Sequence, residues 1–197
     1  MGAKTAAVPS ARERLLAAAN ELFYAEGVHT VGIDRVIERA GVAKASLYNT
    51  FGSKDELVKA YLEGRHERIA TRITRYIERY DGPRERLLGV FEAQGELFAE
   101  PGYRGCAFVS ASAESPGQGV SHAADEYRGW VRGLLTGLAR DAGAPDPEAL
   151  GRQLHMIYDG ASLSARMDRD PSAAVTARAA AGALLDAALA AAPGARP

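Results

Sequence analysis

Residues 27–57 read GVHTVGIDRVIERAGVAKASLYNTFGSKDEL, and this stretch decides the fold. It contains a short segment with helical apolar spacing, 33–40, which ends at Gly41, and a second segment, 44–49, that begins only two residues after the glycine. Glycine readily adopts the left-handed backbone that ends a helix. The pattern therefore predicts two short helices joined by a glycine-containing turn, which is the helix-turn-helix arrangement.

The second predicted helix carries apolar anchors on one side and polar groups on the other. Leu47 and Phe51 supply the inward side, and the outward side is narrow enough for a DNA major groove of about 12 Å width. From Gly41 to Lys54 the sequence holds lysines and no acidic residue, so no carboxylate there repels phosphate. This segment is therefore predicted to be a DNA recognition helix.

The candidate DNA contacts divide by chemistry. Asn49 can bond adenine bidentately, hydroxyl groups bond several bases, and a small residue allows approach to a thymine methyl group. Cations, a phenol and the backbone N–H groups at helix starts suit phosphate, which sets the register without reading sequence. The base-reading candidates are Ala45, Ser46, Asn49 and Thr50, and the phosphate-binding candidates are Lys44, Tyr48 and Lys54.

The flanking sequence continues in helical segments separated by Gly, Pro and Asp, without an alternating apolar run that would indicate a sheet. Ser10 and Glu13 have the spacing of a capping box, which predicts a helix over 11–26. A second such pair precedes a long predicted helix over 54–80. The fold class predicted is all-α.

Two Asp-Pro pairs, at 146–147 and 170–171, indicate the last two helix starts. Aspartate is a good N-cap, and proline in the first turn loses no hydrogen bond that the helix needs. We expect these helices over 147–168 and 171–192.

Residues 11–60 resemble the DNA-binding domain of the TetR family of bacterial transcriptional regulators. The residues that carry the resemblance are Phe23, Gly27, Ala40, Gly41, Val42, Leu47, Tyr48, Phe51, Ser53, Lys54 and Leu57. The chain departs from the family pattern at Gly32, where Ser or Thr is usual, and at Ala43, where Ser is common. Each departure removes a hydroxyl group that could contact phosphate.

The resemblance implies a homodimer with an N-terminal helix-turn-helix DNA-binding domain over 1–53, a connecting helix over 54–80, and a C-terminal ligand-binding and dimerisation domain over 81–197. The last two helices of each subunit would form a four-helix bundle with those of the partner. The recognition helices would then meet successive major grooves of a near-palindromic operator, about 34 to 36 Å apart or a multiple of this. The residues expected in the bundle interface are Leu150, Leu154, Ala161, Ala165, Ala174, Ala181, Gly182, Leu185 and Leu189.

The predicted function is a sequence-specific transcriptional repressor that a small molecule releases from DNA. An enclosed ligand would tilt the long helix and change the separation of the recognition helices, provided that it prefers the non-binding state. The aromatic content after Pro83 suggests an aromatic or lipophilic ligand. The candidate ligand-binding residues are Tyr103, Phe108, Tyr127, Trp130, His155 and Tyr158.

Two alternatives stay open. One is a ligandless DNA-binding adaptor controlled by a partner protein, and the other is a helical enzyme that carries a DNA-binding module. No G-x-S-x-G sequence follows a predicted strand, and the four histidines lack zinc-motif spacing. The sequence therefore predicts no enzyme, no metal and no cofactor, although His155, Tyr158 and Asp159 are close enough to share a polar site. Arg35 and Arg39 are expected to be solvated.

Composition limits the other possibilities. The 197 residues are 47% hydrophobic and 25% charged, as in a folded globule, and the net charge of −1 makes any contact with nucleic acid local. The single cysteine, Cys106, excludes an intramolecular disulfide, and we interpret it as a core residue rather than a sensor thiol. We find no run of about 18 apolar residues and no secretory leader, so no membrane partner and a cytoplasmic location are predicted.

Overall fold

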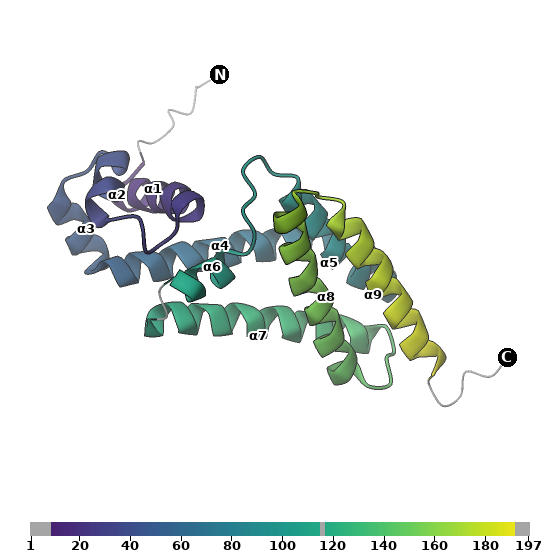
Figure 1. The fold of residues 1–197 in the computed structure, drawn as a ribbon. Coiled ribbons are helices and arrows are strands. Elements are labelled where there is room, and N and C mark those ends of the chain that lie inside the picture. The colour runs from purple at the N-terminus through teal and green to yellow at the C-terminus, as the bar shows by residue number, and fades with distance from the viewer. Residues whose placement is uncertain (1–8, 115–116, 192–197) are drawn as a thin grey trace, which may run out of the picture. The chain divides into compact units, whose positions relative to one another are not determined.

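The computed structural model describes residues 9–114 and 117–191. Within these ranges every regular element is a helix, and no strand occurs (Figure 1). The predicted all-α fold class is therefore confirmed. The helices are α1 (Ala11–Glu26), α2 (Ile33–Ala40), α3 (Lys44–Phe51), α4 (Lys54–Ile77), α5 (Pro83–Phe98), α6 (Ala107–Glu114), α7 (Gln118–Asp141), α8 (Pro147–Asp168) and α9 (Ala173–Ala190).

The chain divides into two compact units. The first is formed by residues 1–65 together with 107–124, and the second by 66–106 together with 125–197. Helix α6 and the first residues of α7 therefore belong to the same unit as α1, α2 and α3, although α5 precedes them in the chain. The functional boundaries predicted after residues 53 and 80 stay a prediction.

Helix α1 begins where local sequence chemistry places it. The Ser10 hydroxyl accepts the backbone N–H of Glu13 at 3.2 Å, and the Glu13 carboxylate accepts the backbone N–H of Ser10 at 2.8 Å. The predicted capping box and the predicted bounds of α1 are thus confirmed. Its buried face, which includes Leu15 and Phe23, packs with α2 and α3 around Val36 and Leu47.

Four predicted helix bounds differ from the structure, and one of them is the end of α9, which lies at Ala190 rather than at residue 192. Helix α3 continues to Phe51, two residues further than predicted, and α4 ends at Ile77 rather than at residue 80. The prediction that α9 begins at Pro171 is wrong, because the Asp170 carboxylate accepts the backbone N–H and the hydroxyl of Ser172, at 2.8 and 2.6 Å. The aspartate thus forms a local turn, and α9 begins only after it.

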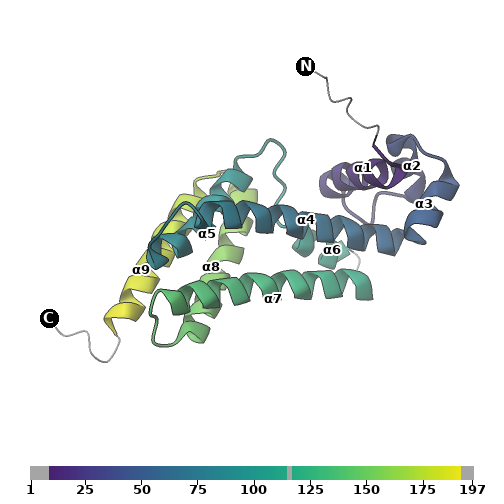
Figure 2. The same ribbon diagram turned by 180° about the vertical axis from the view of Figure 1, so that it is seen from behind.

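In the second unit, α9 lies beside α5 and α8 (Figures 1 and 2). Phe91 of α5, Leu154 of α8 and Leu185 of α9 are fully buried there. Most residues assigned from the sequence to a subunit interface also lie inside this unit, so that assignment is wrong for them. These are Leu150, Leu154, Ala161, Ala165, Ala174, Ala181, Gly182 and Leu185. Leu189 is half-buried.

Helix α9 is long and apolar enough to cross a membrane by length and composition alone, with a mean hydropathy of 1.4 over its 18 residues. One such helix in the described chain is weak evidence. Its two charged side chains pair with α5: Arg178 bonds Glu92, and Asp186 bonds Arg84, both at 2.7 Å. Such pairs fit a helix packed within a globule, since charges inside a bilayer are costly.

The bare start of α3 generates a stability prediction. Ala43 has the extended backbone of an N-cap, with φ −69° and ψ 149°, but no side chain caps the helix. Ala43→Ser should therefore stabilise the protein by about 1 kcal/mol, because its hydroxyl can accept a free N–H of the first turn. The control Ala45→Ser, inside α3, should instead cost about 0.5 kcal/mol through lower helix propensity. Urea denaturation measures both, and equal effects would contradict the capping argument.

Candidate DNA-binding interface and ligand site

The turn between α2 and α3 is fixed by backbone geometry. Gly41 has φ 61° and ψ 43°, the left-handed conformation. Its N–H donates to Glu38 O at 3.1 Å, and the N–H of Val42 donates to Ile37 O at 3.4 Å, which is the Schellman pattern. Arg14 of α1 donates from Nη1 to Gly41 O at 3.0 Å. The turn is therefore attached to α1 as well as closed on itself.

Helix α3 presents its predicted DNA contacts outward. Leu47 is fully buried, which fixes the inward side of the helix. The candidate contacts lie together on the rest of α3 and on the first residue of α4. Lys44, Ala45, Tyr48, Asn49 and Thr50 are exposed, and Ser46 and Lys54 are half-buried. Their exposure fits the predicted role, and their contacts with DNA stay a prediction.

Two of these side chains have partners that the sequence did not indicate. Lys44 Nζ lies 2.9 Å from Asp34 Oδ1 of α2, and this hydrogen bond raises the pKa of Lys44. The Thr50 hydroxyl donates to Ser46 O at 2.6 Å, which leaves its oxygen available as an acceptor. Lys44 and Asp34 are ten residues apart across a turn, so no helical spacing pairs them.

The sequence predicted that the arginines of α2 are solvated, but each of them pairs with a glutamate. Arg35 forms two hydrogen bonds to the Glu26 carboxylate, at 2.6 and 2.9 Å. Arg39 forms an ion pair with Glu21 at 2.7 Å. Both glutamates lie on α1, so the positive charge of α2 is largely matched by its neighbour.

The start of α4 provides further donors for an anion. The Ser53 hydroxyl accepts the backbone N–H of Glu56 at 3.1 Å, as the predicted cap requires. Lys54 is the first residue of the helix. A cation at the positive end of the helix dipole is unfavourable unless an anion is near, which makes this position suited to phosphate.

The aromatic ligand candidates only partly come together. Phe108 lies on α6 in the first unit, whereas Tyr103, Tyr127, Trp130 and Tyr158 lie in the second. The hydroxyl groups of Tyr127 and Tyr158 are 3.0 Å apart, and both side chains are buried. Burial raises the pKa of both phenols, so they stay protonated at neutral pH.

Other candidates complete parts of this interior. The rings of Tyr127 and Trp130 stack with centroids 6.3 Å apart, and His66 of α4 lies 4.9 Å from the Trp130 ring. The hydroxyl of Tyr103 donates to Ser162 O at 3.3 Å. Tyr103 and Trp130 are half-buried, so the aromatic group extends from the interior of the second unit to its surface, and its hydroxyl groups have polar partners.

His155 is buried on α8 beside an ion pair. Its Nε2 atom has no hydrogen-bond partner and lies 3.7 Å from Asp159 Oδ1. The other carboxylate oxygen of Asp159 accepts from Arg128 Nη1 at 2.9 Å. Burial lowers the pKa of His155, against the opposing effect of Asp159, so the ring is neutral at neutral pH.

Gln94 of α5 is a buried polar residue that the sequence analysis missed. Its Nε2 atom donates to Tyr158 O at 3.0 Å and to the Ser162 hydroxyl at 3.2 Å. Its Oε1 atom is buried without a hydrogen-bond partner. The sequence does contain a signal for this burial, because position 94 continues the apolar stripe through Val90, Phe91 and Phe98. A polar side chain at that position must face the core.

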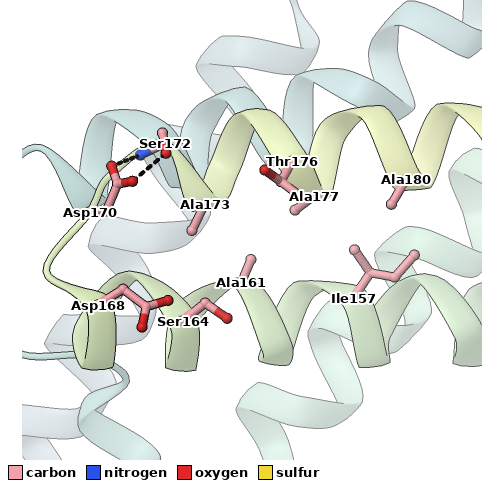
Figure 3. Close-up of a pocket in the computed structure, with 10 residues that line it drawn as sticks. All are labelled: Ile157, Ala161, Ser164, Asp168, Asp170, Ser172, Ala173, Thr176, Ala177 and Ala180. Atoms are coloured by element: carbon pink, nitrogen blue, oxygen red, sulfur yellow. Dashed lines mark hydrogen bonds between the residues drawn. The ribbon is translucent and has the colours of Figure 1, made fainter.

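A pocket of about 380 Å³ opens between α8 and α9 (Figure 3), and none of the predicted ligand residues lines it. Small side chains form most of its wall, and the Asp170 turn closes one end. Its lining residues are Ile157, Ala161, Ser164, Asp168, Asp170, Ser172, Ala173, Thr176, Ala177 and Ala180. Within the described chain no cluster of three or more His, Cys, Asp or Glu side chains could hold a metal.

The fold and the exposed polar helix define a helix-turn-helix DNA-binding protein. The family model for bacterial regulatory proteins of the tetR family matches residues 15–61. The crystal structure of a TetR-family transcriptional regulator from Streptomyces coelicolor is 35% identical in sequence, with a TM-score of 0.85. The similarity covers 90% of this chain and 95% of that one. The chain belongs to the TetR family and is a DNA-binding transcriptional regulator.

Two curated relatives differ in how far they match. The transcriptional activator FasR of Mycolicibacterium smegmatis is 37% identical over 82 residues, which are 42% of this chain and only 37% of FasR. The transcriptional repressor NemR of Escherichia coli is 27% identical over 169 residues, which are 80% of this chain and 85% of NemR. The similarity to NemR thus reaches into both units.

Proposed function

We propose that the protein is a homodimeric, cytoplasmic repressor that reads a near-palindromic operator with α3 and leaves it when a small molecule binds in the second unit. The observation that carries the DNA-reading part is the exposed polar face of α3, held by the buried Leu47 and by the Gly41 turn. Repression rather than activation is supported by NemR, a repressor whose similarity extends over most of the chain.

Two buried polar atoms of the second unit support a ligand. Gln94 Oε1 and His155 Nε2 are buried without a hydrogen-bond partner, and His155 lies beside the ion pair of Arg128 with Asp159. An unsatisfied buried polar atom costs about 1 to 3 kcal/mol. A ligand that donates hydrogen bonds would recover this cost, so we infer an aromatic or lipophilic molecule with a hydroxyl or amine group.

Exposed apolar side chains support dimerisation through α8 and α9. Among the described residues, four of the six exposed large apolar side chains lie on these two helices: Met156, Leu163, Met167 and Val175. In the chain they directly precede Ile157, Ser164, Asp168 and Thr176, which line the pocket between α8 and α9 (Figure 3). Projecting side chains next to a hollow make a surface that can fit a second copy of itself across a two-fold axis.

Dimerisation explains how ligand binding would release DNA. Two recognition helices bind one operator only at a fixed separation, because successive major grooves are about 34 Å apart. A ligand that stabilises a different separation releases DNA by the difference between its affinities for the two states. The alternatives predict other outcomes: an adaptor would release DNA only with a partner protein, and an enzyme would turn over a substrate.

The DNA-reading proposal predicts two different mutant behaviours. Lys54→Ala should weaken binding to all duplex sequences and reduce the salt slope by about 1, because one phosphate contact is lost. Asn49→Ala should cost about 1 to 3 kcal/mol on the preferred sequence only and relax base preference at one position. Fluorescence anisotropy at several salt concentrations, with selected and random duplexes, separates the two. Equal losses on both duplexes in both mutants would contradict this assignment of contacts.

The ligand proposal predicts discrimination by a hydrogen-bond donor. Among 4-ethylphenol, ethylbenzene and 4-ethylbenzoate, the phenol should raise the melting temperature most and release DNA. Gln94→Leu should remove the preference for phenol over hydrocarbon, which is about five- to hundredfold if one buried hydrogen bond is lost.

The matched control is Gln153→Leu, at an exposed position of the adjacent helix α8, which should leave ligand preference unchanged. Melting curves and DNA release are measured on the same preparations. Stabilisation by the phenol without DNA release would argue against an inducer and for an adaptor.

The dimer proposal predicts that a charge on α8 separates the subunits. Leu163 is 62% exposed in the single chain and would be buried against the partner. Leu163→Arg should therefore convert dimer to monomer at micromolar concentration, because an unpaired charge would lose its hydration. Val109→Arg is the control, since Val109 is 56% exposed but lies on α6. Sedimentation velocity would contradict the proposal if both variants stayed dimeric.

A further inference from the structure

The last residue of α6 reaches the loop that joins α1 to α2. The Glu114 carboxylate accepts the backbone N–H of His29 through Oε2 at 3.2 Å. Both residues belong to the first unit, although 85 positions separate them in the chain. The hydrogen-bond partner of the His29 N–H therefore comes from α6 and not from α1, α2 or α3.

Gly27 leaves the room that this carboxylate occupies. A Cβ atom at position 27 would come within 2.4 Å of Glu114 Oε2 and within 2.7 Å of Oε1. Gly27 also has φ +95°, which side chains rarely adopt. The residue that ends α1 thus meets two requirements at once, the backbone turn and the close approach of Glu114.

The position of Glu114 is unfavourable for α6 itself. A carboxylate at the C-terminus of a helix meets the negative end of the helix dipole. The partial positive charge of the His29 N–H offsets this repulsion in the folded unit. The hydrogen bond therefore connects α6 to the α1–α2 loop, and it is not needed to complete either element on its own.

The loop held by Glu114 leads into the DNA-reading helices. Val28 and Val31 bury their side chains on either side of His29, and the N–H of Val31 donates to Gly27 O at 3.3 Å. Helix α2 begins two residues after Val31, and the Gly41 turn fixes α3 to α2. A shift of the loop would therefore be passed to the start of α2 and then to α3.

We propose that Glu114 is a positioning residue for DNA recognition: through the α1–α2 loop it holds α2 and α3 in the arrangement that reads base sequence. It touches no base and no phosphate in this role. The chain enters α6 directly from residue 106 of the second unit, so a change in that unit that moves α6 would reach the reading helices through this contact. The positioning role rests on DNA binding and does not require a ligand.

The loss of the Glu114 charge and the loss of its positioning role predict opposite changes in DNA affinity, so one experiment distinguishes them. Removing a carboxylate should by charge alone strengthen DNA binding, because phosphate is repelled less. Loss of positioning should instead weaken binding to the preferred sequence. The probes are a duplex selected by the wild-type protein from a random pool and a random duplex of equal length.

Glu114→Ala should lower affinity for the selected duplex about tenfold, the size of a lost base contact, with affinity for random duplex unchanged or slightly higher. The control Glu63→Ala removes the same charge from an exposed position of α4 in the first unit and should not lower selectivity. Glu114→Gln keeps an acceptor oxygen and should restore most of the selectivity.

Hydrogen exchange supplies a readout without DNA. The His29 amide should exchange about fivefold faster in Glu114→Ala, because one hydrogen bond of about 1 kcal/mol is lost, and near the wild-type rate in Glu114→Gln. The proposal is overturned if Glu114→Ala keeps wild-type selectivity. It is also overturned if affinity falls equally on both duplexes, since that indicates less folded protein rather than a misplaced α3.

Discussion

The left-handed backbone at Gly41 is the constraint on which the orientation of α3 depends. Helix α3 has eight residues, too few to be stable alone, so its direction is set by what precedes it. The Schellman bonds of the turn fix that direction relative to α2, and the bond from Arg14 to Gly41 O fixes it relative to α1. One buried leucine, Leu47, then decides which face of α3 is exposed.

The charges around this helix favour selective over indiscriminate binding. The whole chain has a net charge of −1, and the arginines of α2 are paired with glutamates of α1. Lys44 is paired with Asp34, so a phosphate must compete for it. Non-specific affinity for DNA rises with the number of free cations, whereas base readout depends on geometry. Because Arg35, Arg39 and Lys44 are already paired, selective binding relies more on the placement of α3.

Sequence predicted the fold where the decisive interactions are local and failed where they are distant. The Ser10–Glu13 capping box and the glycines after α1 and α2 gave correct bounds, because each acts within a few residues. The hydrogen bond between Glu114 and His29 joins residues 85 positions apart, and no local sequence pattern predicts it. The prediction that residues of α9 lie in a subunit interface was wrong, because a helix of mostly alanine has no continuous polar face to show which side is buried in its own unit. The exposed polar face of α3 was predictable because the helix has both an apolar anchor and a polar side. The candidate ligand residues were predicted from aromatic type alone, and Phe108 lies in the other unit.

The chemistry of the second unit restricts what it can enclose. Among the described residues, the buried polar side chains are Gln94, Thr136 and His155, and none carries a charge at neutral pH. Arg128, the cation beside His155, is already paired with Asp159, so a carboxylate or phosphate placed among these side chains would lose its hydration and have to compete for that cation, which costs several kcal/mol or more. A neutral molecule loses little hydration, and a single donor can satisfy Gln94 Oε1. The aromatic rings of Tyr127 and Trp130 add apolar contact area without adding charge. A ligand bound in this interior, as we propose, is therefore expected to be a neutral molecule.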